Sequence, residues 1–196
     1  MTHKKLWLNI FFGILLITAI TLKYQDYRPE TQPVVQETSP APVAKPIIKS
    51  APTPADYPVS ELVNLTNIER TNIGLIPVTE NSLLNQSALA KCNDMATRNY
   101  WSHNTPDGQL PWIFITQTGY SYNRAGENLA YGYTTSKDTM VGWMKSPKHK
   151  ENIVEPLFRE VGFGVCSAKD YIGEPSAGKP KDTIIIVQHF AQPYSY

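Results

Sequence analysis

The sequence is short of the residues on which several protein classes depend. Its net charge at pH 7 is only +1, so it lacks the excess of lysine and arginine that a nucleic-acid partner would require. It has two cysteines, too few for a disulfide scaffold, so a folded domain must depend on its hydrophobic core. No internal repeat is visible. Its 196 residues allow one domain with accessory segments, and exclude two full domains.

Residues 1–23 predict a membrane anchor. Lys4 and Lys5 precede an apolar run of 17 residues, from 6 to 22, close to the roughly 17–25 that a membrane-spanning helix needs. Lysines on the short N-terminal side favour an inside N-terminus, with everything after Lys23 outside. A cleaved signal peptide is the alternative and would make the protein secreted, but no clear cleavage site follows. We therefore expect a single-pass protein of the cell membrane.

Residues 24–58 predict a proline-rich, disordered linker. The segment holds eight of the sixteen prolines, and such a composition favours extended chain over a packed core. At about 3.1 Å per residue it could reach roughly 100 Å. That reach suits a domain held away from a membrane, for example within a cell wall. A stalk with no particular length requirement is the alternative.

Residues 59–196 predict a folded α+β domain. Apolar residues at helical spacing indicate helices at about 60–74, 81–98, 111–119 and 136–146, with a further short helix beginning at "SP". Strands are indicated by "GENLAYGY", "EVGFGVCS" and "TIIIVQHF". The last is apolar on both faces, as a buried central strand is. Between the last two strands, "AKDYIGEPSAGKPKD" predicts a loop. Helices followed by strands indicate helices packed on a sheet.

The two cysteines and three of the four histidines lie in this domain. Cys92 and Cys166 could form a disulfide or remain separate buried thiols, and their spacing does not decide between these. His103 lies beside the turn residues "TPDG". His149 lies in the first helical turn after "SP", where the helix dipole and flanking lysines favour the neutral imidazole that a metal ligand or general base requires. His189, in the apolar strand, is expected to be a packed core residue.

Four motifs then occur in order: "YWSHNTPDG", "GYSYNRAGENLAYG", "GWMKSPKHKENIV" and "EVGFGV". Together they resemble the CAP superfamily, whose SCP domain is shared by cysteine-rich secretory proteins, insect antigen 5 and plant pathogenesis-related proteins. The form with "SPxH" is similar to the bacterial branch. The resemblance covers nearly all of residues 60–190. It implies that residues 59–196 form a three-layer α-β-α sandwich with an open cleft holding two histidines and two acids.

Carried over residue by residue, the resemblance assigns the histidine of "SH" to His103, the acid of "GEN" to Glu127 and the histidine of "SPxHxxNI" to His149. The fourth member has no match. Many eukaryotic members have a glutamate shortly after the tryptophan of the fourth helix, and Ser146 falls near that position here. Glu160, in "FREVGFG", is the candidate substitute.

Two roles for these three residues remain open. A His₂Glu set suits Zn²⁺ or another divalent cation with water in an open position, and some family members hold such an ion there; His103, Glu127 and His149 are therefore the predicted metal ligands. Without a metal, the same three are the catalytic residues of acid–base chemistry if the protein is an enzyme. Structural roles are the alternative: Glu127 could bind backbone amides, and the two histidines could form a hydrogen-bonded pair. Ser102 is adjacent to His103, but sequence neighbours need not face each other.

These observations predict a membrane-anchored, extracytoplasmic SCP-domain protein. The expected function is binding of a divalent metal and of a peptide or lipid ligand within the cell envelope. The alternative is a metal-dependent hydrolase that acts on peptide or cell-wall bonds. The missing second acid favours binding, because that acid could have served as the proton-transfer group.

Overall fold

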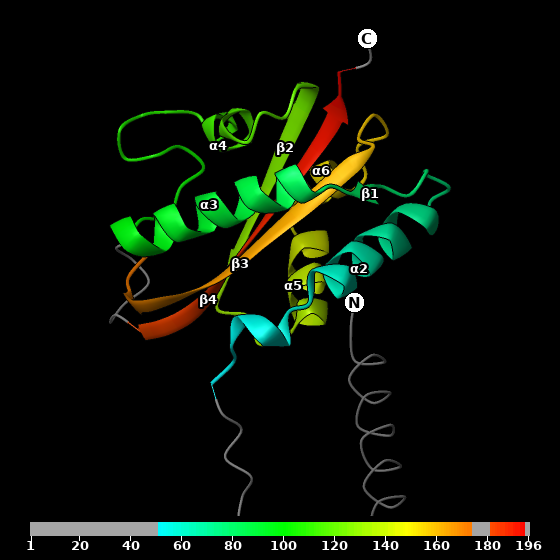
Figure 1. Cartoon of the computed structure of the whole chain (residues 1–196). Helices are drawn as coiled ribbons and strands as arrows, with labels where there is room; N and C mark the ends of the chain where they lie inside the picture. The colour runs from blue at the N-terminus through cyan, green and yellow to red at the C-terminus, as the bar shows by residue number, and fades with distance from the viewer. Residues whose placement is uncertain (1–50, 174–180, 195–196) are drawn as a thin grey trace, which may run out of the picture. The chain divides into compact units, whose positions relative to one another are not determined.

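The computed structural model describes residues 51–173 and 181–194 (Figure 1). The predicted anchor, 1–23, and residues 24–50 of the predicted linker lie outside these ranges. Within them, no helix has both the length and the apolar character needed to cross a membrane. The elements are η1 (Pro54–Asp56), α2 (Val59–Thr71), β1 (Thr79–Glu80), α3 (Ser82–Arg98), α4 (Trp112–Gln117), β2 (Tyr122–Tyr131), α5 (Ser136–Lys145), α6 (Pro147–Ile153), β3 (Glu160–Tyr171) and β4 (Lys181–Pro193).

The strands form one sheet between two helical layers, which confirms the expected α-β-α sandwich. The strand order is β1-β3-β4-β2. β1 runs parallel to β3, whereas β4 is antiparallel to both of its neighbours. Helices α3 and α4 cover one face of the sheet, and α2, α5 and α6 cover the other (Figure 1).

β4 is the central strand, as its sequence predicts. Ile184, Ile186 and Phe190 belong to the core cluster that includes residues of α2 and α5. The alternate residues Ile185 and Val187 pack with residues of α3. Successive side chains of a strand point to opposite faces, so an apolar residue is needed at nearly every position of a strand buried on both faces.

Two glycines of β3 set the depth at which α3 lies on the sheet. A Cβ atom at Gly162 would lie 2.2 Å from the backbone of Leu84, and one at Gly164 would lie 2.2 Å from the backbone of Ala88. Only glycine permits this close approach of helix and strand. The helix is capped by Asn81, whose side chain accepts hydrogen bonds from two backbone amides of the first turn.

The cysteines pair. A disulfide joins Cys92 on α3 to Cys166 on β3, with a Cα–Cα distance of 6.0 Å. The bond lies within the core cluster between α3 and the sheet. It therefore ties the helix to the middle of the strand on which it packs, five residues beyond the last position that pairs with β1.

Ordered structure begins before the expected boundary at residue 59. Tyr57 is only 1% exposed and belongs to the core cluster beneath α2. Its hydroxyl donates a hydrogen bond to the carbonyl of Tyr133 at 2.5 Å. The last residues of the predicted linker are therefore part of the folded domain.

The strands are also longer than predicted. β2 begins at Tyr122, and β1 was not predicted at all, since two residues carry no readable alternation. The two ends of the loop predicted over 168–182 belong to β3 and β4, which pair as far as Tyr171 and Lys181. Cross-strand pairing stabilises this polar hairpin although its residues show no apolar pattern.

Candidate functional site

The site is built around Glu127, which lies in the middle of β2 and is 4% exposed. The carboxylate binds two imidazoles, one with each oxygen. Oε1 is 2.6 Å from Nδ1 of His103, and Oε2 is 2.9 Å from Nε2 of His189. The other nitrogen of His189, Nδ1, is 2.7 Å from the hydroxyl of Ser87 on α3. A hydrogen-bonded chain thus runs from buried Ser87 to partly exposed His103.

Hydrogen bonding and charge decide the ionisation of Glu127. Burial alone would raise the pKa of this carboxyl group, but the hydrogen bonds from His103 and His189, together with the nearby charge of Lys91, outweigh burial and hold the pKa below its ordinary value. Glu127 is therefore a carboxylate at neutral pH and accepts hydrogen bonds with both oxygens.

Lys91 holds the loop that carries His103. Its side chain lies on α3, is fully buried, and donates to the carbonyls of Ser102 and His103 at 2.8 and 2.7 Å. A third bond, of 3.0 Å, reaches the hydroxyl of Tyr100. Burial lowers the pKa of Lys91, and the negative charges of Glu127 and Asp94 oppose that shift. All three ammonium protons have acceptors, as a buried lysine requires.

His149 lies in the first turn of α6, which is fastened to β2 by asparagines. The Asn128 side chain donates to the backbone carbonyl of His149 at 3.1 Å. Asn152 donates to the carbonyl of Glu127 at 3.0 Å and to the side chain of Asn128 at 2.8 Å. His149 is half-buried. Burial, and then the charge of His103, lower its pKa, so the imidazole is neutral at pH 7.

A cleft of about 350 Å³ opens over His103 and Glu127. Its polar lining residues are His103, Asn104, Glu127 and Asn152. Its apolar lining includes Leu110, Pro111 and Trp112, from the loop before α4 and the start of that helix. A ligand in this cleft would therefore meet imidazole and amide groups as well as apolar side chains.

The structure thus brings two of the predicted site residues, His103 and Glu127, into direct contact. It adds His189, which the sequence indicated as a core residue; it is fully buried, yet it is bonded to the carboxylate. A histidine within an otherwise apolar strand was the available signal. Glu160 lies elsewhere, where its carboxylate accepts hydrogen bonds from Tyr120 and Asn81.

The donor set limits how a metal could bind. Within the described residues, no group of three or more His, Cys, Asp or Glu side chains is arranged to hold a metal ion. Both Glu127 oxygens are bonded to imidazoles, so a direct bond from Glu127 to a metal would require the release of one of them. Glu127 binds Nδ1 of His103 and leaves Nε2 of that imidazole as a potential metal ligand.

Neither nearby serine is placed as a nucleophile. Ser87 is fully buried and donates to the carbonyl of Leu84 at 2.9 Å, so its hydroxyl lies out of reach of a substrate. Ser102 contributes its backbone carbonyl to Lys91, and among the described residues no hydrogen bond joins its hydroxyl to an imidazole. A serine-hydrolase mechanism therefore has no support in this geometry.

Comparison with known proteins identifies the family of the chain. The model of the CAP family, described as the cysteine-rich secretory protein family, matches residues 63–190. The uncharacterized protein YkwD of Bacillus subtilis is 38% identical over 130 residues, which are 66% of this chain and 51% of YkwD. The uncharacterized membrane protein YlbC of the same organism is 26% identical over 105 residues, 54% of this chain and 30% of YlbC. The chain therefore corresponds to about half of the first relative and under a third of the second.

Solved structures show the same fold. An extracellular SCP-domain protein of Bacillus anthracis superposes with a TM-score of 0.57 at 22% identity, covering 68% of this chain and 40% of that one. An outer surface protein of Borrelia burgdorferi superposes with a TM-score of 0.58 at 19% identity, covering 69% of this chain and 92% of that one. At these identities the likeness concerns the fold alone.

Proposed function

Because the chain belongs to the CAP family and carries a bacterial-type SCP domain, we propose that it is a binding module of the cell envelope. Its cleft takes a divalent cation and an extended ligand. The observation that carries the proposal is the 2.6 Å contact between Nδ1 of His103 and Glu127. This bond fixes the orientation of a partly exposed imidazole at the edge of an open cleft. The same bond supports Nε2 of His103 as the atom available to a ligand.

His103 and His149 would hold the cation, with Glu127 as the carboxylate that orients His103. Zn²⁺ accepts neutral imidazole ligands, and the lowered pKa of His149 favours that form. A carboxylate bonded to the far nitrogen of a metal-binding histidine sets its tautomer and raises its basicity. The bound cation would supply Lewis acidity at the polar side of the cleft.

The envelope location rests on different support. The first 58 residues have the pattern of an anchor and spacer, and YlbC is named as a membrane protein. The disulfide between Cys92 and Cys166 suits an oxidising compartment. Together they favour a single-pass membrane protein with its domain outside the cell.

Hydrolysis of peptide or cell-wall bonds is the second candidate, and one observation favours it. A carboxylate that orients a partly exposed imidazole is the arrangement of a general base. In that case His103 would take a proton from the attacking water, and Glu127 would stabilise the resulting imidazolium.

Calorimetric titration of the full-length protein with Zn²⁺ tests the proposal. We expect His103→Ala and His149→Ala each to reduce affinity at least tenfold, and Glu127→Gln to reduce it about 10- to 100-fold through loss of orientation. Lys150→Ala, an exposed change in the same helix as His149, is the control and should bind as wild type does. Unchanged affinity in both histidine variants would contradict the metal site. Turnover of a peptide or muropeptide library, lost in His103→Ala, would favour the hydrolase.

A further inference from the structure

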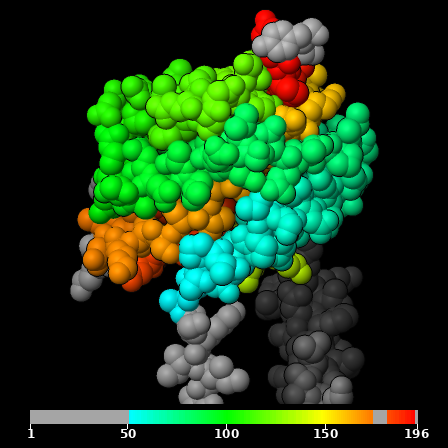
Figure 2. Space-filling view, viewed as in Figure 1, coloured from blue at the N-terminus to red at the C-terminus, as the bar shows by residue number. Residues whose placement is uncertain are grey.

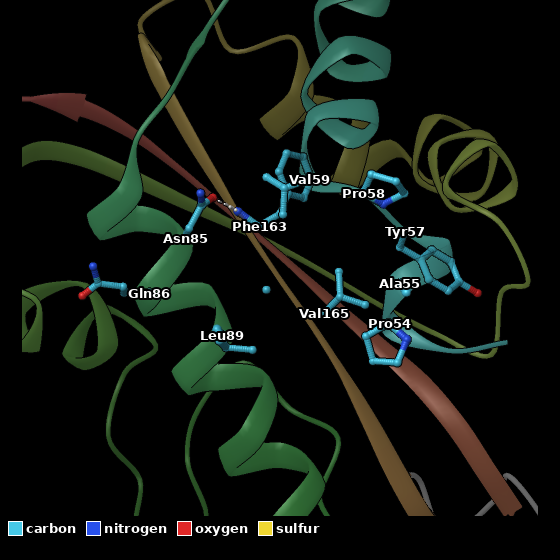
Figure 3. Close-up of a pocket in the computed structure, with 11 residues that line it drawn as sticks. Pro54, Ala55, Tyr57, Pro58, Val59, Asn85, Gln86, Leu89, Phe163 and Val165 are labelled. Atoms are coloured by element: carbon cyan, nitrogen blue, oxygen red, sulfur yellow. Dashed lines mark hydrogen bonds between the residues drawn. The ribbon is translucent and has the colours of Figure 1, made fainter.

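A second cavity, distinct from the histidine cleft, lies at the edge of the sheet between the two helical layers. Its volume is about 450 Å³, within the range of roughly 300–1,000 Å³ typical of ligand pockets. The wall on one side is formed by Asn85, Gln86 and Leu89 of α3. The wall on the other side is formed by Pro54, Ala55, Tyr57, Pro58 and Val59. Between the walls lie Phe163, Gly164 and Val165 of β3 (Figure 3). Figure 2 shows atoms of β3 at the surface between α3 and the η1–α2 segment.

This slot lies where β3 has lost its strand partner. β1 pairs with β3 at only two positions, through Glu160 and Val161. The amide of Asn81 makes a last bond of 2.9 Å to the carbonyl of Val161. The chain then leaves the edge, because Asn81 caps α3, which begins at Ser82. β3 continues for ten more residues, to Tyr171. In the described part of the chain no strand covers this edge beyond Val161.

The backbone groups at this edge can be identified from their neighbours. The carbonyls of Arg159 and Val161 and the amide of Phe163 all bond toward this side, the last to the side chain of Asn85 at 2.8 Å. Backbone groups of a strand alternate between its two edges, so the amide and carbonyl of Val165 point to the same side. The carbonyl of Phe163 and both groups of Val165 therefore face the slot.

We propose that this slot binds a short extended peptide, which adds to the sheet as a strand beside β3. The exposed edge supplies a ladder donor and two acceptors, which an extended backbone matches and other ligands do not. The lining has no Asp, Glu, Lys, Arg or His side chain and is mainly apolar, so it favours uncharged peptide residues. Alternate side chains of the peptide would face Leu89 on one wall and Pro58 on the other.

The probe is the blocked peptide acetyl-Thr-Val-Thr-Val-Thr-amide, added to the ¹⁵N-labelled full-length protein and followed by amide chemical shifts. We expect the peptide to change the amide chemical shifts of Val165 and its neighbours on β3. These changes should be the same at 50 and 500 mM salt, because no ion pair is involved. The same peptide with alternate amides N-methylated cannot complete the ladder and should bind at least tenfold more weakly. A methylated peptide that binds equally well would overturn strand pairing.

Two variants locate the site. Val165→Pro removes the amide that faces the slot and leaves the pairing with β4 intact, as proline at an open strand edge permits; binding should fall at least tenfold. Leu89→Glu places a charge on the wall at an exposed position. Its control is Val141→Glu on α5, which has the same exposure, 44% against 43%, but lies outside the slot.

The outcomes decide the proposal even if Val165→Pro is poorly folded. Weaker binding by Leu89→Glu, with wild-type binding by Val141→Glu, supports it. Equal binding by both variants, shifts confined to the residues of the histidine cleft, or no shift at millimolar peptide would overturn it. A concentration-dependent dimer whose interface shifts map to β3 would also overturn it, since the occupant would then be a second copy.

Discussion

Glu127 and His189 are direct partners in the ladder between β2 and β4, and their side chains meet at 2.9 Å on the α3 side of the sheet. This register places the carboxylate on β2, beside the central strand β4, whereas His103 approaches it from a loop. The strands therefore determine where the charge lies, and the loop, held by Lys91, determines which group faces the cleft. Sites built on such elements are held more precisely than sites built on loops alone.

Glu127→Gln should destabilise the domain at neutral pH. The amide cannot serve both imidazoles as an acceptor, so at least one buried hydrogen bond is lost, at a cost of about 1–3 kcal/mol. Urea denaturation at pH 7 measures this. Gln86→Ala, an exposed change on α3, is the control. A variant as stable as wild type would show that the two imidazole contacts contribute nothing to folding.

The same variant should alter the dependence of stability on pH. The folded-state pKa of Glu127 lies below its ordinary value of 4.5. The stabilisation it provides is therefore complete above that value and is lost as the pH falls through the folded pKa. Wild-type protein should lose unfolding free energy below about pH 4.5, and Glu127→Gln should lack that part of the slope. Parallel curves for the two proteins between pH 3 and 5 would contradict the shift.

Lys91→Met should displace His103 while preserving much of the apolar volume. The substitution leaves the carbonyls of Ser102 and His103 without their donor, and each lost hydrogen bond to the charged ammonium group costs about 1.5–3 kcal/mol. We expect lower stability together with changed imidazole chemical shifts of His103. Lys137→Met, an exposed change on α5, should produce neither effect. Unmoved His103 resonances in a destabilised variant would show that Lys91 supports the fold without positioning the site.

Part of the fold and of the site could be predicted from sequence. The apolar periodicity predicted the helices and strands that form the layers of the sandwich, and the "GEN" and "SH" motifs identified Glu127 and His103. The partner of Glu127 was missed because a strand's apolar pattern shows burial but not register. His189 comes opposite Glu127 only when β2 and β4 pair at that offset. The buried Lys91 was equally hidden, since its acceptors lie on a loop whose path no local pattern predicts.

His149 should titrate below its ordinary pKa of 6.5. Burial is the larger cause and the charge of His103 the smaller one, so His103→Ala should raise the pKa of His149 only part of the way back. The measurement is an NMR titration of the imidazole between pH 4 and 8. Lys148→Ala, at a neighbouring exposed position, tests whether surface charge contributes. A pKa at or above the ordinary value would remove the argument that His149 is neutral at pH 7.

Removal of the disulfide should destabilise the domain more than it disturbs the cleft. Cys92 and Cys166 are 74 residues apart in sequence, and closing a loop of that length in the unfolded chain is worth about 4 kcal/mol in the chain-entropy model. Cys92→Ala with Cys166→Ala should therefore lower the midpoint of urea unfolding sharply. The glycine contacts between α3 and β3 remain in the double variant, so Lys91 should keep its position one residue before Cys92. Imidazole shifts of His103 should then match wild type in native buffer. Shifts that change as much as in Lys91→Met would show instead that the disulfide, acting through α3, holds the histidine loop in place.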